Sequence, residues 1–128
     1  MIELSIDRAN RLVVVRFVGS MEAQDFERLD AVLGALPENE TLRCIVDLGG
    51  VQDVKVASPA LVNRARGQPA LPTVYKVFAA PTEMSFGISR QFSTHRDLSG
   101  LPGPRIVRSF EEALQRLSVT DARFDPLG

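Results

Sequence analysis

The stretch LRCIVDLGGVQDVKVASPAL, residues 42–61, holds the pattern from which the fold can be predicted. Residues 42–48 form a short and nearly continuous apolar run, which is typical of a strand that is covered on both faces of a sheet. Gly49 and Gly50 follow directly and predict that the strand ends there. The stretch therefore predicts a buried strand followed by an exposed loop over residues 49–57.

A helix is predicted to begin at Ser58 and to end near Gly67. A serine at a helix start accepts a hydrogen bond from the first turn, and Pro59 needs no N–H partner there. The residues alone favour this structural cap as the role of Ser58. The alternative is a phosphorylation site, because a phosphate is favourable at a helix N-terminus yet changes any docking surface built around it.

Strands and helices alternate on both sides of this stretch. Residues 2–6 and 12–18 have the alternation and β-branched content of two strands, and the turn-forming residues between them predict a hairpin. The remaining expected elements are a helix over 22–36, a strand over 73–80, a helix over 82–95, a strand over 105–108 and a capped helix over 109–117. The order β-β-α-β-α-β-α-β-α predicts an α/β domain with a mixed, mostly parallel sheet and an N-terminal β-hairpin.

Composition and charge narrow the class of protein. The chain has 128 residues, 45% of them hydrophobic and 24% charged, which is the balance of one globular domain. The net charge is −1 and the arginines are scattered, so we expect no nucleic-acid partner. Cys44 lies in the apolar run and is interpreted as a small buried hydrophobe. The single cysteine is consistent with a reducing compartment.

The sequence also leads to expectations about membrane segments, cellular location, metal binding and catalysis. No apolar run approaches the ~20 residues of a membrane span, and the first residues lack the pattern of a secretory signal. We therefore expect no transmembrane segment and a cytoplasmic protein. One histidine and one cysteine make no zinc set, and no cofactor fingerprint or nucleophile elbow is present. No metal, cofactor or catalytic residue is predicted, and the chain is not expected to be an enzyme.

Three segments resemble the STAS family, and more closely its small bacterial SpoIIAA-like proteins. They are VVVRFVGSMEAQDFERL, CIVDLGGVQDV and RIVRSFEEALQRL, and the likeness covers residues 1–118, leaving residues 119–128 as a C-terminal tail with weak periodicity that we expect to be loosely ordered. The resemblance implies a single STAS-like domain that acts without catalysis. It implies a protein partner, as in the anti-sigma-factor antagonists. It also implies that Ser58 matches the serine at which a partner kinase phosphorylates those antagonists.

The helix predicted over 82–95 offers a second candidate site. The resemblance implies a small apolar, lipid-like ligand beneath this helix, because some SpoIIAA-like proteins are thought to bind such molecules. A plain core helix is the simpler interpretation, and Gly87 within it indicates close packing or a bend. The candidate residues for the apolar ligand are Met84, Phe86, Ile88 and Phe92.

Two functions therefore remain open after the sequence has been considered. The first is a regulatory or protein-interaction module that presents the loop 49–57 and the helix from Ser58, with Ser58 as its switch. The second is a carrier or sensor of an apolar ligand. The sequence leaves the partner and the oligomeric state open, a homodimer included.

Overall fold

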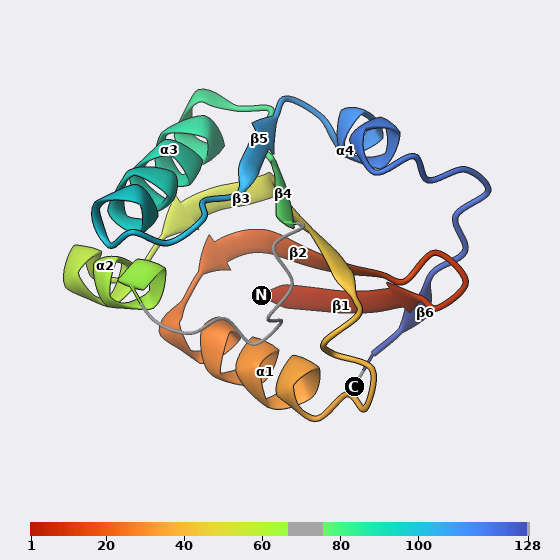
Figure 1. The fold of residues 1–128 in the computed structure, drawn as a ribbon. Helices are drawn as coiled ribbons and strands as arrows, with labels where there is room; N and C mark the ends of the chain where they lie inside the picture. Colours follow the sequence, from red (N-terminus) through yellow and green to blue (C-terminus); the bar gives the residue numbers. More distant parts are fainter. Residues whose placement is uncertain (67–75, 128) are drawn as a thin grey trace.

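The computed structural model describes residues 1–66 and 76–127, which form a six-stranded sheet with helices on both faces (Figure 1). The strand order is β5-β4-β3-β2-β1-β6, with parallel pairing from β2 to β5 and antiparallel pairing of β1 with β2 and β6. The mixed, mostly parallel sheet with its opening hairpin is therefore confirmed. The strands are β1 (Ile2–Asp7), β2 (Leu12–Met21), β3 (Arg43–Val54), β4 (Lys76–Ala79), β5 (Arg105–Val107) and β6 (Asp125–Pro126).

The helices follow the predicted order. They are α1 (Ala23–Gly34), α2 (Ser58–Arg66), α3 (Glu83–Leu98) and α4 (Phe110–Arg116). The strand expected over 73–80 is described only from Lys76, since residues 73–75 lie outside the described part of the chain. Within the described residues, no helix is long and apolar enough to cross a membrane.

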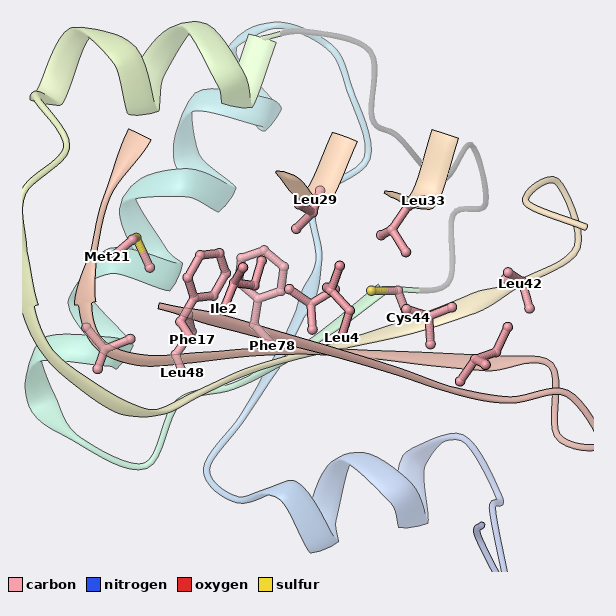
Figure 2. Packing of buried hydrophobic residues seen from close by; sticks show 14 of the residues in the cluster. Ile2, Leu4, Phe17, Met21, Leu29, Leu33, Leu42, Cys44, Leu48 and Phe78 are labelled. Carbon is pink, nitrogen blue, oxygen red and sulfur yellow. The ribbon is translucent and has the colours of Figure 1, made fainter. Parts of the chain in front are cut away.

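The central strands are buried on both faces, and this explains their nearly continuous apolar runs. In β2, Val13, Val15 and Phe17 belong to the core under α1, α2 and α3, whereas Leu12 and Val14 belong to a second core under α4. Figure 2 shows the first core, with Leu29 and Leu33 of α1 pointing toward the sheet and α4 on the opposite side. A polar residue at any of these strand positions would therefore be buried in one of the two cores.

Cys44 is part of the first core, as predicted. Its side chain is 3% exposed and lies among apolar neighbours on β3 (Figure 2). Burial raises the pKa of the Cys44 thiol to about 12, because the thiolate would be poorly solvated there. The thiol therefore stays protonated at neutral pH and packs as a small hydrophobe.

The inward face of α3 differs from the prediction. Met84, expected to point inward, is 48% exposed, and the fully buried positions are Ser85 and Ser89. The Ser89 hydroxyl donates to the Ser85 carbonyl at 2.8 Å, so its polarity is satisfied within the helix. These short side chains allow α3 to lie close to its neighbours, which an apolar periodicity does not reveal.

Residues 119–127 lie against the sheet, whereas the tail over 119–128 was expected to be loosely ordered. Asp125–Pro126 forms β6 against β1, and Val119 is buried in the second core. The Phe124 ring lies 6.3 Å from that of Phe110 on α4, between ring centroids. These contacts hold residues 119–127 against the sheet, although their own sequence pattern is weak.

Asp7 joins this segment to the opening hairpin. Its carboxylate accepts hydrogen bonds from the Asn10 backbone at 3.1 Å, the Asn10 amide at 2.7 Å and the Arg123 backbone N–H at 3.0 Å. The two bonds to Asn10 confirm the predicted turn. These donors lower the pKa of Asp7 below its ordinary value of 3.8, with the Asn10 side chain contributing most.

Asp7→Asn tests this junction. A lowered pKa means that the carboxylate stabilises the fold above the unfolded-state pKa and that this stability is lost as the pH falls through the folded-state pKa. We expect Asp7→Asn to reduce the free energy of unfolding at pH 7 by about 1–3 kcal/mol and to flatten its decline below about pH 4. Urea unfolding at a series of pH values measures both effects.

The exposed Asp97 supplies a matched control for that experiment. Asp97→Asn should change the free energy of unfolding by no more than ~0.5 kcal/mol. If the two variants lost equal stability with equal pH dependence, the role assigned to Asp7 would be wrong.

Candidate functional site

Strand β3 continues through the two glycines that were predicted to end it. It extends to Val54 and stays paired with β2, whose last residue, Met21, is the register partner of Val54. The expected loop over residues 49–57 is therefore wrong for residues 49–54, which are strand. The cause is that β2 is also long and offers a backbone partner over this whole length, which outweighs the low strand propensity of glycine.

Gly50 has a specific reason to be glycine. The pairing of β2 with β3 shifts register between Arg16 and Val18 and again between Gly19 and Ser20, as it does at a β-bulge. A Cβ at Gly50 would lie 3.0 Å from the Phe17 carbonyl oxygen, which is backbone and cannot turn away. The glycine therefore allows the two strands to approach closely where their register changes.

The outer edge of β3 is open beyond β4. Pairing of β3 with β4 ends at Asp47, so within the described residues the segment from Leu48 to Val54 pairs with β2 alone. We call residues 49–60, from this open segment to the first turn of α2, the β3–α2 edge. Its exposed residues are Gly49, Gln52, Asp53, Lys55, Ala57, Pro59 and Ala60.

Asp47 fixes the base of this edge. One of its oxygens, Oδ2, accepts a hydrogen bond from Arg16 Nε at 2.9 Å, and the other accepts from the Gly49 N–H at 2.9 Å. The Arg16 guanidinium also lies 5.2 Å from the Phe110 ring centroid. Asp47 therefore anchors the backbone at Gly49.

Ser58 begins α2 at the end of this edge. The Ala57 carbonyl accepts hydrogen bonds from the N–H groups of Ala60 at 3.0 Å and Leu61 at 3.3 Å, which start the helix. The Ser58 side chain lies outside the part of the structure that is described. Whether Ser58 acts as a cap or as a phosphorylation site therefore stays a prediction.

The second half of α2 is tied to its neighbours. Arg64 donates two hydrogen bonds to the Asp30 carboxylate of α1, at 3.0 and 2.8 Å, and its guanidinium lies 4.6 Å from the Phe26 ring centroid. From α3, the buried Arg96 donates to the Ala65 carbonyl at 3.2 Å. These bonds hold the end of α2, while the exposed Pro59 and Ala60 lie in its first turn.

A small hollow lies between α2 and α3, where the sequence predicted an apolar ligand. Its lining residues are Leu61, Ile88, Gln91, Phe92 and His95. The cavity volume is about 20 Å³, which is room for about one water molecule, whereas ligand pockets measure roughly 300–1,000 Å³. The buried His95 Nδ1 has no hydrogen-bond partner among the described residues, and a water in this hollow would provide one.

The four candidate residues for the apolar ligand are not brought together. Ile88 and Phe92 line the hollow, whereas Met84 is exposed. Phe86 packs elsewhere, with its ring centroid 4.4 Å from the Arg108 guanidinium and 5.9 Å from that of Arg90. Arg90 lies one turn along α3 from Phe86, whereas Arg108 follows β5 and is distant in the sequence.

Two further predictions concern this helix and metal binding. Among residues 1–66 and 76–127, a Cβ at Gly87 would meet no atom within 4 Å outside the neighbouring backbone of α3, so the close packing that this glycine suggested is not found there. Within residues 1–66 and 76–127, no group of three or more His, Cys, Asp or Glu side chains could hold a metal ion.

Two solved structures share this arrangement. One is the anti-sigma factor antagonist SpoIIAA in its unphosphorylated form, with 17% sequence identity and a TM-score of 0.61 over 94% of this chain and 100% of that chain. The other is an uncharacterized DUF3478-family protein from Shewanella loihica PV-4, described as having a SpoIIAA-like fold, with 13% identity and a TM-score of 0.58 over 91% and 92% of the two chains. No family model and no curated protein matches the sequence. The chain therefore has the SpoIIAA-like fold that the sequence resemblance implied.

Gly50→Ala tests the packing at the β3–α2 edge, and Gly87→Ala on α3 is its control. We expect Gly50→Ala to lower the free energy of unfolding by about 1–3 kcal/mol, because its Cβ presses on the Phe17 carbonyl. Gly87→Ala is the matched control in open space, and we expect it to raise the free energy of unfolding by up to about 1 kcal/mol. Urea unfolding measures the free energy of unfolding of both variants. If Gly87→Ala were destabilised while Gly50→Ala kept its stability, the close approach assigned to Gly50 would be wrong.

Proposed function

We propose that this chain is a non-catalytic STAS-like interaction module that binds a protein partner through the β3–α2 edge. The fold likeness to an anti-sigma factor antagonist supports this class of function. The observation that carries the proposal is the extension of β3 beyond β4: among the described residues the segment after Asp47 pairs with β2 alone, and Gln52 and Asp53 are exposed there.

The chemistry of the edge suits a protein surface. Gln52 supplies an amide that donates and accepts hydrogen bonds, and Asp53 and Lys55 carry opposite charges. Ala57 and Ala60, which are exposed and small, allow another backbone to come close to the start of α2. Charged groups that alternate in sign favour recognition of a complementary partner rather than general attraction to a polyanion.

Ser58 is proposed as the switch of this module. It is the first residue of α2, near the C-terminal end of the edge. A phosphate would add a charge of about −1.5 to −2 three residues after the exposed Lys55 in the chain. That change in charge and bulk would weaken the binding of a partner that fits the unmodified edge.

The apolar-ligand alternative finds less support. The hollow beside Ile88 and Phe92 has a volume of about 20 Å³, so a lipid-like chain would have to separate α2 from α3. The hydrogen bond from Arg96 of α3 to the Ala65 carbonyl of α2 opposes that movement. The alternative therefore stays a prediction from the sequence, as does a homodimer.

Site-specific photo-crosslinking maps the proposed interface. A photoreactive amino acid is placed at Gln52 on the edge or at Glu111, an exposed residue of α4, and each variant is expressed in the native cells. We expect one heterologous adduct from position 52 and none from position 111, because α4 covers the other face of the sheet. The same adduct from both positions, or an adduct from position 111 alone, would contradict this choice of surface.

Charge substitution tests the switch separately. We expect Ser58→Glu to weaken partner binding about tenfold or more, equivalent to ~1.4 kcal/mol, and Ser58→Ala to bind like the unsubstituted chain. Ser99→Glu, on the exposed C-terminal cap of α3, adds the same charge elsewhere and should leave affinity unchanged. Titration of the crosslinked partner measures all three; full affinity of Ser58→Glu would remove the switch but not the module.

A further inference from the structure

Strand β5 forms one edge of the sheet. It spans Arg105–Val107 and, among the described residues, pairs with β4 alone (Figure 1). The Val107 carbonyl accepts a hydrogen bond from the Ala80 N–H at 2.8 Å, so the backbone groups of Val107 face β4. Because backbone groups point to alternate sides along a strand, the N–H and the carbonyl of Ile106 face away from the sheet. The outer side of β5 therefore offers a backbone donor and a backbone acceptor for further pairing.

Two arginines meet one aromatic ring beside this edge. Arg108 is the residue after β5, and its guanidinium lies 4.4 Å from the ring centroid of Phe86 on α3. The Arg90 guanidinium, one turn further along α3, lies 5.9 Å from the same centroid. The ring is half-buried, whereas both arginines are exposed. The ring therefore holds two accessible cations next to β5.

These cations have no counter-charge in the described part of the chain. No carboxylate there forms an ion pair with Arg90, Arg108 or the exposed Arg105. The Glu112 carboxylate accepts a hydrogen bond from the Arg108 backbone N–H at 3.1 Å, but it forms no ion pair with the side chain. The β5 edge therefore carries positive charge that an acidic group from another molecule would neutralise.

The arginines lie on both faces of the sheet at this edge. Val107 belongs to the core under α4, so Arg105, two residues earlier, projects on the α4 side. Arg108 contacts Phe86 of α3, on the opposite side. An extended segment paired with β5 alternates its own side chains between these two sides. Acidic residues of such a segment would therefore meet an arginine on either side of the sheet.

Charge and backbone chemistry together select the occupant. Pairing of β5 with the β5 edge of a second copy would bring arginines together, and like charges on adjacent strands are destabilising. A nucleic acid would satisfy the arginines, but it has no peptide groups to pair with the backbone of Ile106. An acidic stretch of polypeptide satisfies both requirements.

We propose that the β5 edge binds an extended acidic segment of a protein by strand addition. The segment pairs with the outward backbone groups of Ile106, and its carboxylates bind Arg105 on one side and Arg108 and Arg90 on the other. This surface is separate from the β3–α2 edge, because β4 lies between β3 and β5. Binding here does not depend on the partner proposed for the β3–α2 edge.

The test titrates the full chain against labelled peptides and follows fluorescence anisotropy. The probe alternates glutamate with valine over about six residues, which is the length of a common strand. We expect this peptide to bind, and a lysine–valine peptide of the same length not to bind. The acidic peptide with methylated backbone nitrogens keeps every carboxylate but loses its N–H donors, so it should bind at least about tenfold more weakly. Equal affinity of the two acidic peptides, or no binding of either, would overturn the proposal.

Hydrogen exchange and two substitutions locate the bound peptide. We expect the Ile106 amide to exchange at least about tenfold more slowly with the acidic peptide bound, while the Val107 amide, which faces β4, changes little. Arg108→Gln should weaken binding about fivefold or more. Arg8→Gln removes the same charge at the β1–β2 turn, across the sheet, and should change the affinity less than about twofold. Unchanged exchange at Ile106, equal losses from both substitutions, or full displacement of the peptide by an equimolar single-stranded oligonucleotide would contradict strand addition.

Discussion

The pairing of β2 with β3 is the interaction on which the rest of the structure depends. These two strands are the longest in the sheet and run side by side from Leu12 and Arg43 to Met21 and Val54. The pair supplies apolar side chains to both cores, so the helices on each face pack against the same two strands. Its far end also determines where α2 starts. The architecture and the proposed interaction surface therefore have one physical origin.

The sequence predicted the architecture well because burial on two faces leaves a strong pattern. The β-branched runs around Val14 and Ile45 have few other stable solutions once helices alternate with them. The capped start of α4 was equally visible, and the Ser109 side chain accepts a hydrogen bond from the Glu112 N–H as expected. Local chemistry and global fold agree at these positions, which is the condition under which a sequence can be interpreted without coordinates.

The errors have physical causes that no local pattern carries. Gly49 and Gly50 predicted the end of a strand. The pairing with β2 nevertheless supplies enough backbone contact for β3 to continue through both glycines. Ser85 and Ser89 are polar by type, so their burial depends on close packing that only the fold creates. The contact of Arg108 with Phe86 joins residues far apart in the chain.

The open side of β3 has a consequence for how copies of this chain behave in solution. An unpaired strand edge is a template on which another molecule can add a strand, and such addition leads to aggregation. Here the N–H groups of Gly49 and Val54 donate to the carboxylates of Asp47 and Asp53. Those two donors are therefore already occupied, and the exposed Asp53 adds a negative charge beside Val54. The same few residues can thus stay accessible to a specific binder while discouraging indiscriminate self-assembly.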